Sequence, residues 1–294
     1  MKYDWITILD RAAALHAQEF ALVGTAPTLR RLHYKVVSDP ACVAAGYVNT
    51  LNLYKQFSDR TARAREAGTF PDLSDESREI LHAAGSTGLP DIAATARWYA
   101  QNHTLRRDLE LPVQVVLIAE KEGQMPSLAS RFAWLPRTYT KGFNSVTHMR
   151  RVAGLNDHRR RTVGLYLGDY DPSGLDITRD LAAKVPFEVQ RALLTWDQVQ
   201  ELDLPPLPAK ANDSRSARMM AEHGRVVQVE VEALDTQVAL DIVAKAIEDV
   251  AEVTLRPDGL PDLPEVDRAE ADQRDQLMQV AGIVADALGG DHDE

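Results

Sequence analysis

The sequence predicts an α/β protein with a parallel-rich sheet, preceded by an α-rich domain of the winged helix-turn-helix kind. Short β-branched, apolar runs begin at Val113 and Val163, and each ends in acidic residues and a glycine. From residue 113 to about residue 250 such runs alternate with helical patterns, which is typical of a parallel sheet. Three helical patterns and an extended segment come before them, as in a winged helix.

The N-terminal region divides into helices at recognisable stop and start signals. Residues 5–21 have the apolar spacing of a helix, and Thr28 is placed to cap a second helix that ends at Asp39 and Pro40. A third helix is expected from about residue 48 to 67, followed by a turn or wing at Gly68-Thr-Phe-Pro. A plain helical bundle is the alternative to a winged helix.

Two aspartates follow the apolar run that begins at Val163. Residues two apart in extended chain point to the same side, so Asp169 and Asp171 project together from the carboxyl end of a buried strand. Open α/β sheets place their sites at that end. Crowded carboxylates favour a hard divalent cation between them, Mg²⁺ above all. The alternative is an acidic turn in which Asp171 only caps the next helix.

A third carboxylate, Glu120, ends the upstream run Val113–Ala119 in a matching context. A strand followed by Glu, and about fifty residues later a strand followed by Asp-x-Asp-x-x-Gly, resembles the Toprim domain of topoisomerases, primases and related nucleases. The resemblance implies a Rossmann-like sheet. It also implies that Glu120, Asp169 and Asp171 bind Mg²⁺ around a scissile phosphate.

A second motif, Thr28-Leu-Arg30-Arg-Leu-His33-Tyr34, is similar to the tyrosine motif of the type IIB topoisomerase A subunit and the meiotic double-strand-break transesterase. In that family an arginine stands four residues before the nucleophilic tyrosine, and Arg30 and Tyr34 fit this spacing. The resemblance extends over roughly residues 25 to 250, including Val229-Glu-Val-Glu-Ala-Leu234, and the length fits the compact Mini-A group. His33 stands where the family usually has an aromatic residue, so the identity of the nucleophile stays open.

The topoisomerase VI A-subunit resemblance implies an enzyme that cleaves double-stranded DNA through a phosphotyrosyl link, with Tyr34, Arg30 and Glu120 as catalytic residues. It further implies a homodimer in which the tyrosine of one subunit meets the metal of the other, and an ATPase partner subunit. No Gly-x-x-x-x-Gly-Lys-Ser/Thr loop occurs in the sequence to supply ATP binding. The alternatives are a Toprim nuclease that uses activated water, and a non-catalytic DNA-binding protein.

Four regions are expected along the 294 residues, whose hydrophobic content of 45% suffices for packed cores. They are a winged-helix domain with the candidate tyrosine (1–73), a helical linker (74–111), a Toprim domain (112–254), and a linker, acidic helix and tail (255–294).

The net charge of −11 is unevenly divided. Residues 1–161 carry 22 Lys and Arg against 16 acidic residues, whereas residues 162–294 carry 11 against 28. Clustered basic residues are what neutralisation of DNA phosphates requires, although solvated helix faces are the ordinary alternative. The expected DNA-binding residues are Arg31, Lys55, Arg60, Arg63, Arg65, Lys141, Arg159, Arg160 and Arg161.

The sequence predicts a cytoplasmic, nucleoid-associated protein with no membrane partner. It contains no apolar run of about 18 residues, and its start, Met-Lys-Tyr-Asp-Trp, does not have the pattern of a signal peptide. The single cysteine, Cys42, excludes an internal disulfide and a cysteine-based zinc site.

Overall fold

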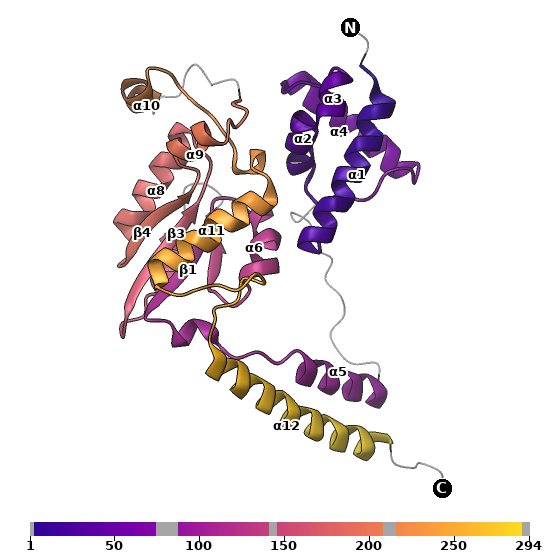
Figure 1. Ribbon diagram of the computed structural model, residues 1–294, viewed down its shortest axis with the longest axis vertical. Coiled ribbons are helices and arrows are strands. Elements are labelled where there is room, and N and C mark those ends of the chain that lie inside the picture. The colour runs from indigo at the N-terminus through magenta and orange to yellow at the C-terminus, as the bar shows by residue number, and fades with distance from the viewer. Residues whose placement is uncertain (1–2, 75–87, 141–145, 208–215, 290–294) are drawn as a thin grey trace.

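The computed structural model describes residues 3–74, 88–140, 146–207 and 216–289 (Figure 1). Within them, one apolar core lies among the N-terminal helices, and two further cores cover the two faces of a sheet. Lys141, one of the expected DNA-binding residues, falls outside the described residues.

Four helices make up the N-terminal unit: α1 (Trp5–Val23), α2 (Leu29–Ser38), α3 (Pro40–Ala44) and α4 (Leu51–Glu66). A side-chain oxygen caps each helix by accepting a backbone N–H from its first turn, and Thr28 does so for α2 as predicted. The three expected helices are confirmed, and α3 is an additional short helix between two of them.

The segment expected to form a turn or wing is a compact turn in the structure. No strand occurs in the described residues 3–74. After α4 the chain turns at Gly68, which has a φ of +70°, and Phe70 then packs into the N-terminal core with 7% of its surface exposed. Because Phe70 draws the segment inward, it forms a turn rather than a projecting hairpin, and a winged helix stays a prediction.

The described sheet has four strands, all parallel, in the order β2-β1-β3-β4, with bounds Arg137–Tyr139, Val113–Ala119, Arg161–Leu167 and Glu188–Leu193 respectively. The predicted parallel-rich sheet is therefore confirmed. Both central strands are apolar along nearly their whole length because both faces of the sheet are covered.

Helices cover the sheet on both sides. Leu117 and Leu165 belong to the core that includes α6 (Met125–Phe132) and α11 (Thr236–Ala251). Ile118 belongs to the opposite core, with α7 (Val146–Ala153) and α8 (Pro172–Lys184). The result is the three-layer arrangement of a Rossmann-like α/β domain.

The order of the strands creates a switch point between β1 and β3. The chain leaves β1 toward β2 on one side and leaves β3 toward β4 on the other. Ala119 and Leu167, the last residues of β1 and β3, are paired. The residues that follow them therefore emerge side by side at the place where open α/β sheets bind ligands.

The described residues also form α9 (Trp196–Glu201), α10 (Ser216–His223) and the short 3₁₀ helices η1 (Arg107–Glu110), η2 (Glu122–Gln124) and η3 (Val231–Ala233). Among the helices of the described residues, no segment has the length and hydropathy of a membrane span.

An arm of two helices extends away from the sheet (Figure 1). It pairs α5 (Leu89–Gln101) with α12 (Pro264–Gly289), the expected C-terminal helix. The predicted linker and the predicted C-terminal region thus pack together, although the linker precedes the strands of the sheet in the sequence and the C-terminal region follows them.

A buried ionic cluster holds the root of this arm. Glu270 is 5% exposed and accepts hydrogen bonds from the backbone N–H of Leu105 (2.9 Å), from Arg107 (3.1 Å) and from Arg274 (2.6 Å). Arg107, 4% exposed, also pairs with Asp267 at 2.6 Å. Removing one member of such a cluster leaves buried charge without its partner.

We predict that Glu270→Ala lowers the free energy of unfolding by about 3–5 kcal/mol, because it removes one of the two carboxylates that pair with the buried Arg107 and leaves the backbone N–H of Leu105 without its acceptor. Urea denaturation followed by circular dichroism measures this. The control is Glu265→Ala, an exposed position on the same helix, which should change stability by less than about 0.5 kcal/mol. Equal stability of the two variants would show that the cluster does not hold the arm.

Candidate functional site

Three carboxylates meet at the switch point of the sheet. Glu120 follows β1 directly, and its Oε2 accepts hydrogen bonds from the backbone N–H of Asp169 (3.0 Å) and the hydroxyl of Tyr166 (3.2 Å). Burial raises the pKa of Glu120, and the charge of Asp171 adds to the rise. Asp171 also caps α8, accepting the N–H of Gly174 at 2.6 Å. The charge of Asp171 thus acts on Glu120, while its side chain has the capping role that the sequence offered as the alternative.

Asp169 is the most constrained of these acids. It is 5% exposed, and its two oxygens are engaged by the backbone N–H of Val231 (3.0 Å) and the ammonium of Lys121 (2.8 Å). Burial raises the pKa of Asp169 to about 7; Lys121 opposes the rise, whereas the carboxylates of Glu120 and Glu232 add to it. Burial, more than the neighbouring charges, therefore accounts for the raised pKa of this residue.

Lys121 is an internal cation in the site. Its Nζ lies 2.8 Å from Asp169, 3.3 Å from Glu232 and 3.9 Å from Glu230. Burial alone would lower its pKa, but the surrounding carboxylates raise it above the ordinary lysine value. The ammonium thus offsets part of the charge that a metal ion would otherwise neutralise.

The donors at this edge suit a hard cation in chemical type, because Glu120, Asp169 and Asp171 offer carboxylate oxygens under mutual repulsion. Within the described residues, however, no group of three His, Cys, Asp or Glu side chains has the arrangement of a metal site. Lys121 holds one oxygen of Asp169, so a metal would share that carboxylate with the lysine or displace it. Mg²⁺ binding stays a prediction.

Gly174 lets α8 approach the carboxylates. A Cβ at this position would lie 2.3 Å from the carbonyl oxygen of Asp169 and 3.3 Å from Oε2 of Glu120. Backbone cannot yield to such a contact as the end of a flexible side chain can. The glycine of the Asp-x-Asp-x-x-Gly motif is therefore required by the close packing of the helix start on the Asp169 backbone.

Arg191, on β4, organises the loop after β3 and was not found by sequence reasoning. Its guanidinium donates to the carbonyls of Gly168 (3.0 Å), Asp169 (3.1 Å) and Gly174 (2.6 Å), and to the hydroxyl of Thr178 (2.7 Å). It thereby ties β4, α8 and the loop that carries Asp169. The only signal in the sequence was a lone arginine directly before the apolar Ala-Leu-Leu at the end of a strand.

The tyrosine motif lies on α2, which faces η3. Glu230 forms an ion pair with Arg30 and accepts a hydrogen bond from the hydroxyl of Tyr34 at 3.2 Å. Tyr34 is 3% exposed, and burial together with the negative charge of Glu230 raises its pKa. Arg30 also lies over the ring of Tyr54, 5.7 Å from its centre.

Glu230 connects this motif to the carboxylates of the same chain. Lys121 is 3.9 Å from the Glu230 oxygen that pairs with Arg30, and 2.8 Å from Asp169. Tyr34 and Asp169 are thus linked within one chain, through Glu230 and Lys121. The resemblance had implied that the tyrosine meets the metal of a partner subunit.

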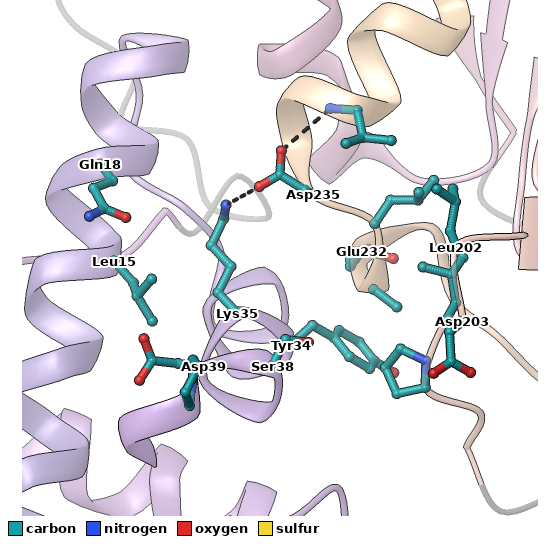
Figure 2. Close-up of a pocket in the computed structure, with 16 residues that line it drawn as sticks. Leu15, Gln18, Tyr34, Lys35, Ser38, Asp39, Leu202, Asp203, Glu232 and Asp235 are labelled. Atoms are coloured by element: carbon teal, nitrogen blue, oxygen red, sulfur yellow. Dashed lines mark hydrogen bonds and ion pairs between the residues drawn. The ribbon is translucent and has the colours of Figure 1, made fainter. Parts of the chain in front are cut away.

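Cavities lie on two sides of Tyr34. One has a volume of about 410 Å³, and there Tyr34 extends from α2 toward Leu202 and Asp203 while Lys35 reaches Asp235 at 3.2 Å (Figure 2). The other has a volume of about 400 Å³ and is lined by Arg30, His33, Tyr34, Asn49, Tyr54 and Glu230 among others.

His33 is part of the packing beneath the tyrosine motif. One ring nitrogen lies 2.7 Å from the hydroxyl of Tyr47, and the other lies 3.3 Å from the side-chain oxygen of Asn49. Burial lowers its pKa, which favours the neutral ring. Both nitrogens have partners, so the residue orients α2 rather than standing free as a base.

The predicted DNA-binding residues of α4 lie mostly at the surface. Lys55, Arg60 and Arg63 are exposed and Arg65 is half-buried, while the guanidinium of Arg60 lies 4.4 Å from the centre of the Trp5 ring. Arg31 is different: it is 6% exposed and donates to the hydroxyl of Thr236 at 2.8 Å. A DNA contact by Arg31 is not supported, because its guanidinium is enclosed between α2 and α11.

The second basic cluster lies at the amino end of β3, whereas the carboxylates lie at the carboxyl end of the strands. Arg159, Arg160 and Arg161 lie at or just before the amino end of β3, about 20 Å along the strand from its carboxyl end. Arg160 is largely buried, donating to the carbonyls of Asp108 and Leu111 at 2.6 Å. Arg159 and Arg161 are exposed, and they pair with Asp157 and Glu188.

No protein-family model, curated protein or solved structure matches the chain.

We predict that Gly174→Ala destabilises the protein by about 1–3 kcal/mol, because the added Cβ meets the Asp169 carbonyl. Chemical denaturation measures this change. Gly282→Ala on α12 is the control, since no atom lies within 4 Å of its added Cβ, and it should stabilise slightly through better helix propensity. The same effect from both substitutions would contradict the packing argument.

Proposed function

We propose that this protein is a Mg²⁺-dependent DNA-cleaving transesterase that resembles a Mini-A topoisomerase VI A subunit and forms a phosphotyrosyl link through Tyr34. One observation carries the proposal. Arg30 and Tyr34 on α2 share Glu230 with Lys121, which in turn holds Asp169 at the switch point of the sheet. A hydroxyl nucleophile, fixed cations and a carboxylate cluster are the groups that phosphodiester transesterification needs.

The reaction balances without an external reactant. The tyrosine oxygen forms a bond to phosphorus, the bond from phosphorus to the deoxyribose oxygen breaks, and the tyrosine proton ends on the departing hydroxyl. The phosphotyrosyl bond keeps the phosphorus activated, so the deoxyribose hydroxyl can reverse the step and reseal the strand.

Cations of this chain would stabilise the negative charge on the reacting phosphate. The guanidinium of Arg30 suits two phosphate oxygens at once, and Lys121 adds a second positive charge. Glu120, Asp169 and Asp171 would hold Mg²⁺, which when bound stabilises negative charge on the phosphate. Arg191 keeps the Asp169 backbone in position from the other side.

DNA reaches the site along α4 in this proposal. The start of that helix lines the 400 Å³ cavity together with Arg30, and Lys55 and Arg63 continue as exposed cations along the helix. Phosphate contacts of this kind give affinity without sequence specificity. A homodimer supplies the second site that cleavage of both strands requires, an ATPase subunit would be a separate chain, and the nucleoid of the cytoplasm is the expected location.

A metal nuclease that uses activated water is the second candidate. The observation in its favour is the enclosure of Tyr34, whose pKa is raised by burial and by Glu230, so that the hydroxyl is a poor nucleophile in this arrangement. A non-catalytic DNA-binding protein is the third, since Lys121 already neutralises part of the carboxylate cluster.

Tyr34→Phe should abolish the covalent adduct between protein and DNA, and Asp169→Ala should abolish Mg²⁺-dependent cleavage. The phenyl ring lacks the attacking oxygen, and alanine removes a carboxylate that is central to the cluster. Adducts are measured by electrophoresis in denaturant after incubation with labelled duplex DNA. Cleavage by Tyr34→Phe without an adduct would select the nuclease, and full activity of Asp169→Ala would end the Toprim proposal.

Mixing these two variants separates the two ways of building the site. Recovery of nicking would mean that partner subunits contribute the tyrosine and the carboxylates, as the resemblance implies. No recovery, with the wild type active, would mean that each site is completed within one chain, as the link from Tyr34 through Glu230 to Lys121 favours.

Arg63→Glu should weaken binding to all DNA sequences alike and reduce the slope of log affinity against log salt by about 0.9 for each phosphate that the arginine neutralises. Titrations of fluorescence anisotropy at several salt concentrations give this slope. Arg159→Glu makes the same charge change just before the amino end of β3, whereas the carboxylates lie at its carboxyl end. This variant should leave the slope unchanged. Equal effects of the two substitutions would contradict a DNA path along α4.

A further inference from the structure

Glu230 collects donors from both halves of the chain. Its carboxylate pairs with Arg30, accepts the hydroxyl of Tyr34 at 3.2 Å and lies 3.9 Å from the ammonium of Lys121. Glu230 itself is 6% exposed. Two cations and a hydroxyl around one buried anion form a site that is built for negative charge.

The same three donors suit a phosphate group. A guanidinium binds carboxylate and phosphate oxygens in the same forked geometry, and an ammonium serves either anion as a point charge. A carboxylate carries two oxygens and one negative charge, as do the non-bridging oxygens of a phosphodiester. Glu230 therefore matches a phosphodiester in the charge and the acceptors that it presents to Arg30, Tyr34 and Lys121.

The backbone of Glu230 is fixed, so only its side chain is able to leave. Val229 and Tyr170 exchange two backbone hydrogen bonds, of 2.8 and 3.0 Å, and the N–H of Val231 donates to Asp169 at 3.0 Å. These contacts hold both neighbours of Glu230 against the Asp-x-Asp segment. Rotation of the side chain would vacate the anion site without separating α2 from the α/β domain.

An incoming anion has a route to the site. The side chains of Arg30 and Lys121 are 45% and 31% exposed. The 400 Å³ cavity is lined by Arg30, Tyr34 and Glu230, and the start of the basic helix α4 forms part of its wall. A phosphate that entered this cavity would meet Arg30 first and Glu230 directly behind it.

We infer that Glu230 is an internal phosphate mimic, which fills an anion site made by Arg30, Tyr34 and Lys121 until a phosphodiester of DNA displaces it. The inference rests on the proposed function for the source of the anion, which is DNA. A phosphodiester of DNA and a free phosphate offer the site the same chemistry. Displacement also releases the Tyr34 hydroxyl from its hydrogen bond to Glu230, so that its oxygen faces the phosphate that has taken the place of the carboxylate.

The test is DNA binding without metal, measured by fluorescence anisotropy with a short labelled duplex in a chelator. Glu230→Gln should bind roughly tenfold more tightly than wild type, because one charge-assisted hydrogen bond no longer has to be broken. Glu230→Asp keeps the charge but shortens the side chain, so it should gain affinity in the same direction. Adding Arg30→Gln to either variant should remove the gain.

Asp241→Asn is the matched control, because it removes one negative charge from an exposed carboxylate that pairs with Arg131 on the α/β domain. It should change affinity by less than about twofold. Inorganic phosphate added as a competitor identifies the source of the anion. Competition that is stronger in Glu230→Gln than in wild type supports a general phosphate site, whereas a gain for DNA alone assigns the site to the phosphodiester backbone.

Two results would overturn the inference. One is a gain in affinity by Asp241→Asn equal to that of Glu230→Gln, which would reflect net charge alone. The other is loss of thermal stability in both Glu230 variants with no gain in affinity, which would make Glu230 an interface residue only. If the wild type forms an adduct in either case, the proposed function still holds. A gain in affinity without any adduct would support the anion site and contradict the transesterase activity.

Discussion

The balance of buried charge at the junction of β1 and β3 is the constraint on which the rest of the site depends. Asp169, Glu230 and Glu232 are each less than 9% exposed and lie close together, with Glu120 beside them. Carboxylates in such a place need partners of opposite charge, because an unpaired buried charge is strongly destabilising. Lys121 comes from the end of β1 and Arg30 from α2, so the requirement for charge balance joins segments that are far apart in the sequence.

This balance also explains how the N-terminal helices are attached to the sheet domain. The contacts from α2 to the sheet domain include polar ones: Arg31 donates to Thr236, Lys35 pairs with Asp235, and Tyr34 donates to Glu230. The apolar core of α1–α4 is separate from the cores on the sheet. The position of the helices is therefore set by ion pairs and hydrogen bonds, whereas the stability of each unit comes from its own apolar core.

Local patterns in the sequence predicted the main helices and strands, and also the edge of the sheet where Glu120 and Asp169 lie. The apolar runs before Glu120 and Asp169 predicted two parallel strands, and strand ends in a parallel sheet determine where the next residues emerge. Glu230 could not be connected to Arg30 in this way, since 200 residues separate them and no local pattern encodes such a contact. Arg31 looked like a surface cation because its helical position does not reveal the α11 surface that encloses it. The inward packing of Phe70 likewise depends on a tertiary core, so the sequence left both a turn and a wing open for this segment.

The pairing of α5 with α12 has a consequence for how the chain is made. Because α5 precedes the sheet and α12 follows it, α5 leaves the ribosome long before the helix that covers it exists. Contacts between segments so distant in sequence form late in folding, after the loop between them has been closed. The sheet domain can begin to fold around β1 and β3 as they emerge. The arm, and with it the cluster around Glu270, is completed only once α12 has been synthesised, so it forms after the sheet.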